Sequence, residues 1–423
     1  MTTQPPPYHA LDLPALQTPW QTFSQRIQAT VQATLAHPDF GELQAASPQE
    51  FADAKILHPF IQTAILEPMR WLMPSAHSRV IRLLQLDASH SSLGNNLGTR
   101  FAHSMTPLLL NPLMPHFGAV ALPFAALLNL CGIEKASDDL HILGFEMRHG
   151  EQCDQQRIVT PYRAVLAPFL TLVLEVIDGA YPDLNTVARH VRRWDVPLID
   201  SPITTTLQAL LALLPAEELS PSERWWVEHP LHTTLMLNLV AVALVVESSA
   251  SFPEPVRTLV LEALRQRYTG VQAQLANPSM ALGDALAVGA DTILVKCVFA
   301  VLLGCVVLAQ PDQHRAIERH WAALLQAINT GAGLIRLAND LGALTIAHPT
   351  LKTTLQNIQP GHAAMFPYAM FATLRPHIRQ HAESSFELLL DRLLRDGEGR
   401  EYNIGLCASA NEWSCPGQMW HTF

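Results

Sequence analysis

The segment Ala332–His348 reads AGLIRLANDLGALTIAH and places a polar pair, Asn339 and Asp340, inside a strongly apolar helical pattern. The pattern comes from leucines spaced three or four residues apart, namely Leu334, Leu337, Leu341 and Leu344. Burying a carboxylate costs several kcal/mol unless it is paired with a cation or bound to a metal ion. Two interpretations therefore stay open: Arg336, one turn earlier, neutralises Asp340, or the polar pair binds a metal.

Most of the chain shows the same helical period, and proline or glycine separates one periodic segment from the next. Clear strand alternation is missing, and no Asn-Gly pair joins two β-branched runs. We therefore predict an all-α protein with helices over 14–36, 48–72, 76–87, 116–149, 160–178, 203–215, 221–248, 254–275, 279–309, 312–347 and 362–395.

The composition restricts the classes of partner. Of the 423 residues, 49% are apolar and only 15% are charged, which is enough to build a large core and also line a cavity. The net charge is −10, and lysine and arginine form no block, which argues against binding to nucleic acid or to an anionic membrane surface. A polyanionic substrate would need clustered arginines or a divalent cation.

The six cysteines show no Cys-x-x-Cys spacing, so we predict reduced core residues in a cytoplasmic protein. The N-terminus lacks the basic stretch and apolar stretch of a signal peptide. Two apolar runs, Thr233–Val246 and Thr292–Gln310, have the composition of membrane spans. The first is too short to cross a bilayer and Lys296 interrupts the second, so we predict buried core helices and a protein that is not transmembrane.

A second acidic site lies in the segment ASDDLHILGFEMRHG, at Asp138 and Asp139. Glu146 follows two helical turns after Asp139 on nearly the same face, and Arg148 offers a cation beside it. An alternative stays open, because Ser137 or Asp138 could instead cap the N-terminus of a helix that begins here.

Two acidic sites on separate helices suit a hard divalent cation. Magnesium takes oxygen ligands and bridges substrate phosphates, whereas clusters of His and Cys favour zinc. The candidate Mg²⁺ ligands are therefore the oxygen-bearing side chains of the two sites: Asp138, Asp139, Glu146, Asn339 and Asp340.

Three short blocks resemble class I terpene synthases, within a stretch of about residues 115–405. Arg336–Gly342 is similar to the RLxNDL helix that carries the second metal motif of that family. Pro278–Leu286, followed by Thr292-Ile293, is similar to its PSxxxYL…T(I/V)G helix. Asp138-Asp139 is similar to its first aspartate-rich helix, and the Arg-x-Gly that follows is closer to trans-prenyl diphosphate synthases, which share the fold.

The resemblance implies a large helical bundle in a single domain, around an apolar central cavity and with extra N-terminal helices. It implies that Asp138, Asp139 and Asn339 are catalytic because they hold Mg²⁺ at a diphosphate. Together with the polar break at Ser89–Arg100, it gives the expected division of the chain into a disordered segment 1–14, an N-terminal helical layer 15–112, the bundle 113–405 and a tail 406–423.

The resemblance further implies side chains that bind the diphosphate. The arginine that senses diphosphate in the family aligns with Gly289, so Lys296 takes that role two turns later. Ala343 and Ala347 occupy the later positions of the second metal motif. The expected diphosphate-binding residues are Arg336, Lys296, Arg148, Arg400 and Tyr402.

The implied activity is Mg²⁺-dependent ionisation of a C15 or C20 prenyl diphosphate, which gives a terpene hydrocarbon or alcohol. The fold would allow a homodimer. Two alternatives stay open. One is chain-elongating prenyl transfer, which needs a second diphosphate site. The other is a non-catalytic helical protein that binds a lipid or a partner helix, because several metal ligands of the family are missing here.

Overall fold

The computed structural model describes residues 19–45, 55–74, 106, 109–139, 155–179, 184–195, 219–276 and 282–347. Only the backbone is described at 135–139, at 155–164, at 337–347 and at a few single positions. Every secondary-structure element in the described part is a helix, so the all-α prediction is confirmed there. The helices predicted at 76–87, 203–215 and 362–395 lie outside it.

In chain order the elements are α1 (Pro19–Leu35), α2 (Phe40–Ala45), η1 (Lys55–Leu57), α4 (His58–Leu72), η2 (Asn111–His116), α8 (Phe117–Asp139), α9 (Gln155–Ile177), α10 (Leu184–Val191), α12 (Pro221–Glu228), α13 (Pro230–Ser248), η4 (Ser249–Ser251), α14 (Glu254–Ala276), α15 (Leu282–Thr292), α16 (Val295–Ala309), η5 (Pro311–Gln313), α17 (His314–Arg319) and α18 (Trp321–Ala347).

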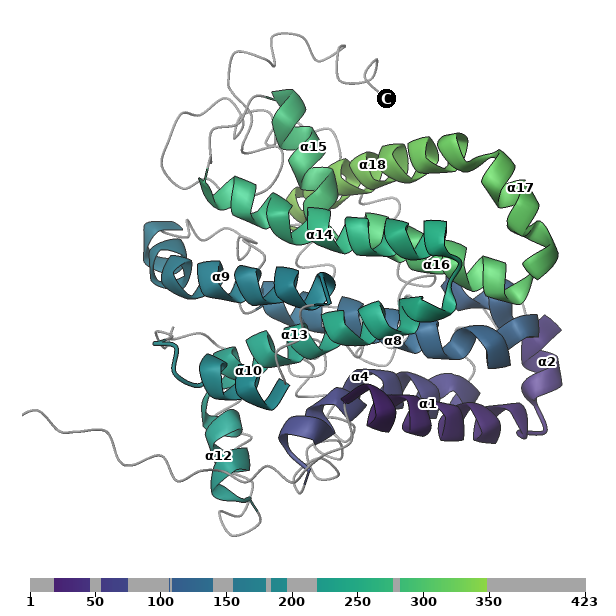
Figure 1. Ribbon diagram of the computed structural model, residues 1–423, viewed down its shortest axis with the longest axis horizontal. Coiled ribbons are helices and arrows are strands. Elements are labelled where there is room, and N and C mark those ends of the chain that lie inside the picture. The colour runs from purple at the N-terminus through teal and green to yellow at the C-terminus, as the bar shows by residue number, and fades with distance from the viewer. Residues whose placement is uncertain are drawn as a thin grey trace, which may run out of the picture.

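Two long apolar helices, α8 and α13, pack against each other in the interior. All residues of α13 from 232 to 246 are buried, as expected for a helix enclosed by other helices. α1 and α4 cover one side of this pair, α14 and α16 lie on the other, and α15 and α18 lie beyond them (Figure 1). This stacking brings the C-terminal end of α8 next to α14 and α16.

Three helices that the sequence predicts as continuous are divided in the structure: 221–248, 279–309 and 312–347. The first is broken at His229, because Pro230 begins α13 and proline cannot continue a helical hydrogen-bond ladder. The second is broken at Leu294, whose backbone is left-handed, with φ 62° and ψ −6°. The third is broken at His320, between α17 and α18. The sequence also left the short helices α2 and α10 unassigned.

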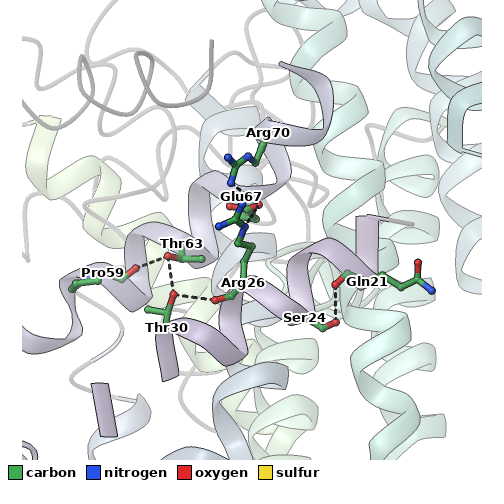
Figure 2. A network of polar contacts seen from close by, with 8 residues as sticks. All are labelled: Gln21, Ser24, Arg26, Thr30, Pro59, Thr63, Glu67 and Arg70. Atoms are coloured by element: carbon green, nitrogen blue, oxygen red, sulfur yellow. Dashed lines mark hydrogen bonds and ion pairs between the residues drawn. The ribbon is translucent and has the colours of Figure 1, made fainter. Parts of the chain in front are cut away.

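A polar seam joins α1 to α4 (Figure 2). The hydroxyls of Thr30 and Thr63 lie 3.3 Å apart across the two helices. Further along, the buried carboxylate of Glu67 lies 3.7 Å from both Arg26 and Arg70. Burial raises the pKa of Glu67, and the two arginines oppose that rise. The N-terminal helices are therefore held to each other by side chains from both.

Asn129 of α8 compensates for a proline inside α4. Pro68 has no N–H to donate to the carbonyl of Ala64, four residues earlier. Asn129 Nδ2 donates instead to the Ala64 oxygen at 3.0 Å and to the Ile65 oxygen at 3.2 Å. A side chain from one helix thus pairs a carbonyl that the neighbouring helix cannot pair itself.

We expect Asn129→Leu to lower the free energy of unfolding by about 1–3 kcal/mol, because it leaves the buried Ala64 carbonyl without a donor. Pro68→Ala returns a backbone N–H to that carbonyl. The double variant should therefore lose about 1 kcal/mol less than the sum of the two single changes. Urea unfolding of the wild type and the three variants measures this coupling. Additive losses would show that Asn129 does not compensate for Pro68.

Candidate functional site

A buried polar cluster joins the C-terminal part of α8 to α13 and α14. The Glu134 carboxylate accepts hydrogen bonds from Arg267 Nη2 at 2.7 Å, from the Tyr268 hydroxyl at 2.7 Å and from Asn238 Nδ2 at 3.2 Å. The Tyr268 oxygen also lies 3.0 Å from Asn238 Oδ1. None of the four residues is more than 5% exposed, so an ion pair and two polar neighbours lie inside an apolar core.

The buried surroundings of this cluster favour the protonated forms of the tyrosine hydroxyl and the cysteine thiols near it. Burial and the negative charge of Glu134 raise the pKa of Tyr268 well above its usual value, so the phenol stays protonated and donates. Burial, with a smaller effect of Glu134, raises the pKa of Cys131 to about 12, and burial raises that of Cys297 as well. Cys131, Cys297 and Cys305 are free and buried, as predicted for core cysteines, and thiols of high pKa are poor nucleophiles.

α14 approaches the junction between α15 and α16 closely. A Cβ atom on Gly270 would lie 2.9 Å from Thr292 Cγ2, so a larger residue there would push the two helices apart. Lys296, in the first turn of α16, forms an ion pair with Asp291 of α15 and lies 3.4 Å from Gln266 Oε1 of α14. The predicted diphosphate-binding lysine is therefore engaged with a carboxylate that the sequence analysis did not single out.

α16 and α18 are joined through η5 and α17 and run antiparallel (Figure 1). Gly331 of α18 lies against Phe299 of α16, since a Cβ atom at Gly331 would be 3.3 Å from Phe299 Cε2. α15 packs against α18 as well. The two helices run in opposite directions and each advances 1.5 Å per residue. Counted from the contact between Gly331 and Phe299, Arg336 and Asn339 therefore lie level with the start of α16 and the end of α15. Arg336 is 7% exposed.

In the described part of the chain α16 packs against both α8 and α18 and lies between them, and three predicted parts of the site lie on these helices toward the same end. They are the last turn of α8, which carries Asp138 and Asp139, the start of α16, which carries Lys296, and the stretch of α18 that carries Asn339. The α8 backbone stays helical through Asp139, so the alternative in which Ser137 or Asp138 caps the start of a helix is wrong.

The structure does not place every predicted site residue. Glu146, Arg148, Arg400 and Tyr402 lie outside the described residues, and so do the side chains of Asp138, Asp139, Asn339 and Asp340. Within the described side chains, no group of three or more His, Cys, Asp or Glu could hold a metal ion, and the predicted magnesium ligands are not among them. The magnesium site, and the pairing of Asp340 with Arg336, stay predictions.

The apolar central cavity also stays a prediction. A pocket of about 10 Å³ lies between α4, α8 and α13, which is room for a single water molecule and far too little for an isoprenoid chain. Its lining residues are Ile65, Pro68, Met69, Asn129, Ile133 and Leu237.

Two helical segments in the described part of the chain, Asn111–Glu134 and His232–Ser251, are long and apolar enough to cross a membrane. A third arises if Val295–Ala309 and Pro311–Arg319, which are bent by 115°, count as one span. In the structure, 78% of the apolar stretch of the first segment and 89% of the apolar stretch of the second are buried within the protein. Packing of this kind agrees with core helices, and the prediction that the chain is not transmembrane stays untested.

Comparisons with known proteins identify no relative of this chain. No protein-family model matches it, and no curated protein or solved structure matches it either. The resemblance to class I terpene synthases therefore remains a prediction from the three short sequence blocks.

The sequence analysis did not single out the buried cluster, although a signal for it was present. Asn238 stands alone within the otherwise apolar run LMLNLVAV, and Glu134 follows the run LLNLCGI, in which Asn129 is the one polar side chain. A lone polar side chain in a buried helix requires a partner. The sequence does not show which helix supplies that partner, and Arg267 and Tyr268 lie more than a hundred residues after Glu134.

A second polar cluster lies where α10, α12 and α13 meet. The guanidinium carbon of Arg192 is 4.4 Å from the centroid of the Trp225 ring, and the His229 ring stacks on Trp225 at 4.1 Å. His232 Nε2 lies 2.9 Å from the backbone oxygen of Trp194. This packing buries His232.

Burial lowers the pKa of His232, and the charges of His229 and Arg192 add to this, while the Trp194 carbonyl and Asp195 oppose it. The unfolded chain therefore takes up a proton at His232 more readily than the folded protein does. The neutral His232 ring makes its full contribution to the free energy of unfolding above about pH 6.5, the ordinary pKa of histidine in an unfolded chain. This contribution is lost as the pH falls below that value. We expect the free energy of unfolding to fall on acidification, and to fall less steeply in His232→Gln. Equal slopes in urea titrations at several pH values would contradict this.

Proposed function

We propose that the protein is a class I terpene synthase-like lyase that ionises a C15 or C20 prenyl diphosphate. The observation that carries the proposal is the uneven polarity of one helix pair. Charged and polar residues gather at the start of α16 and at the level of α18 beside it, and from Cys297 onward α16 carries only apolar residues and one glycine. A prenyl diphosphate has the same division, because a polyanionic head is joined to a hydrocarbon chain.

The polar end offers two cations to a diphosphate. Lys296 stands in the first turn of α16, and Arg336 lies at the same level of α18. A diphosphate entering here would compete with Asp291 for the Lys296 ammonium. Arg336 is buried, and charges in such surroundings are screened less than in water, which strengthens an interaction with a bound anion.

The apolar part of the pair offers a surface for the hydrocarbon chain. α16 is the most apolar of the described helices, and one set of its side chains is only partly buried: Val298, Phe299, Leu302, Leu303 and Val306. On α18, Leu334 and Ile335 are 47% and 42% exposed. Neighbouring exposed apolar side chains are typical of a surface that binds something apolar.

The break between α15 and α16 also supports the proposal. Leu294 follows Thr292-Ile293, so it holds the position that is glycine in the T(I/V)G pattern of the family. Leu294 has a left-handed backbone with φ 62°, a conformation that glycine adopts without strain and leucine does not. The chain thus makes the turn that the pattern's glycine would favour, at the same position, and Lys296 follows two residues later.

The reaction breaks the allylic C–O bond, whose electron pair leaves with the diphosphate. Magnesium held by Asp138, Asp139 and Asn339 would neutralise charge on the leaving group. Lys296 and Arg336 would hold diphosphate oxygens from the protein side. The apolar side chains of α16 and α18 would limit the access of water to the allylic cation. The cation then loses a proton to give a hydrocarbon, or it takes up one water molecule that loses a proton to give an alcohol.

Incubation of the purified protein with C10 to C25 prenyl diphosphates, with and without Mg²⁺, tests the proposal. We expect release of free diphosphate together with a terpene hydrocarbon or alcohol, detected by gas chromatography and mass spectrometry, and only in the presence of Mg²⁺. A longer prenyl diphosphate as the product would instead indicate chain elongation. Inertness toward every substrate would indicate a non-catalytic binding protein.

A further inference from the structure

We infer that the buried cluster of Glu134, Asn238, Arg267 and Tyr268 consists of positioning residues for the metal-binding end of α8, an inference that rests on the proposed function. The cluster fixes the last turn of α8 relative to the α15–α16 junction. It thereby sets the position of the α8 backbone at Asp138 and Asp139 relative to Lys296 of α16.

The cluster holds α8 close to its end. Glu134 stands one helical turn before Asp138, and Asp139 lies only about 7.5 Å further along the axis. Arg267 donates a hydrogen bond to Oε2 of Glu134, whereas Tyr268 and Asn238 both donate to Oε1. Because these donors come from two other helices, α8 cannot rotate or slide here without breaking a buried hydrogen bond.

The same stretch of α14 also holds the opposite side of the site. Gln266, which precedes Arg267, contacts Lys296 at 3.4 Å. Gly270, two residues after Tyr268, packs closely on the last turn of α15. One and a half turns of α14 therefore contact both the end of α8 and the junction that carries Lys296.

Stability by itself does not account for such a cluster. Well-packed apolar side chains of similar volume often stabilise a core as well as a buried ion pair does, or better. Directional hydrogen bonds differ from apolar contacts because they specify one register and one rotation of the helices they join. The positioning role is the property that an apolar replacement would lose.

The test replaces the whole cluster by apolar side chains of similar size, in the variant E134M/N238L/R267M/Y268F. We expect this variant to fold with an undiminished free energy of unfolding. The Mg²⁺ concentration for half-maximal turnover should rise by at least about tenfold, as for the loss of groups that orient metal ligands. Amide hydrogen exchange at residues 135–139 should become about tenfold faster, since the last turn is no longer held.

A matched control changes the buried ionic group between α1 and α4, in the variant R26M/E67M/R70M, and should leave the Mg²⁺ dependence and the exchange at 135–139 unchanged. If the fourfold variant does not fold, Tyr268→Phe removes one donor with little change in volume and should shift both readouts in the same direction. Unchanged Mg²⁺ dependence and unchanged exchange in a folded variant would overturn the inference. A wild type without turnover refutes the proposed function alone, and the exchange measurement then decides whether the cluster holds α8.

Discussion

Replacing Asp139 with alanine is expected to lower magnesium-dependent turnover by more than about 100-fold without unfolding the protein. Losing a group that merely orients a metal ligand costs 10–100-fold, so the loss of a ligand itself should exceed that range. Alanine is a strong helix former, so the substitution keeps the α8 backbone helical at this position. Asn339→Ala should have the same effect from the α18 side. Diphosphate release at several Mg²⁺ concentrations measures the change, and circular dichroism monitors the fold.

The matched control for these variants is Glu254→Ala. Glu254 also stands at a helix end, but its side chain is 79% exposed and its ion-pair distance to Arg257 is 4.0 Å. Its removal should leave turnover unchanged. Full activity in Asp139→Ala or Asn339→Ala would refute the metal-site assignment. It would leave the proposed reaction itself standing.

Replacing Glu134 alone with alanine is expected to lower the free energy of unfolding by about 3–5 kcal/mol, a large share of the stability of a typical domain. The change leaves the Arg267 guanidinium buried without its carboxylate and removes the acceptor of Tyr268. The paired variant E134M/R267M removes both charges and should recover most of the loss. Urea unfolding curves of the three proteins measure the difference.

Glu254→Ala serves again as the control, because an exposed ion pair contributes at most about 1 kcal/mol. A loss below about 1 kcal/mol in Glu134→Ala would mean that the Glu134–Arg267 pair contributes no more than a surface pair. The prediction for Glu134 does not depend on any enzymatic activity, so it holds whether or not the proposed function does.

Helices were predictable from the sequence wherever the cause is local. The apolar period marks both ends of α14, the start of α8 and the C-terminal end of α9 to within a few residues. Pro230 marks a break that the prediction passed over. The breaks at Leu294 and His320 carry no proline or glycine. Leucine in a left-handed backbone is unfavourable in isolation, so packing of α15 and α16 against α14 and α18 must hold it there.

The candidate site was predictable only in part, for a similar reason. Carboxylates and amides stand out in apolar helices, so Asp138, Asp139 and Asn339 could be singled out from the sequence as candidate metal ligands, and that assignment stays a prediction. The ion pair between Lys296 and Asp291 depends on how the chain turns between α15 and α16. The Glu134 cluster depends on contacts across more than a hundred residues of sequence.

The sequence by itself determined that the described part of this protein is helical, that the apolar run 233–246 is buried, and that a lone polar residue in such a run needs a partner. Hydrophobic period and the cost of burying charge act locally and are therefore visible in the chain. Only the tertiary structure decided which partners meet. It joined Glu134 of α8 to Arg267 and Tyr268 of α14 and placed α16 between α8 and α18, because helix packing, unlike helix formation, depends on surfaces that are distant in sequence.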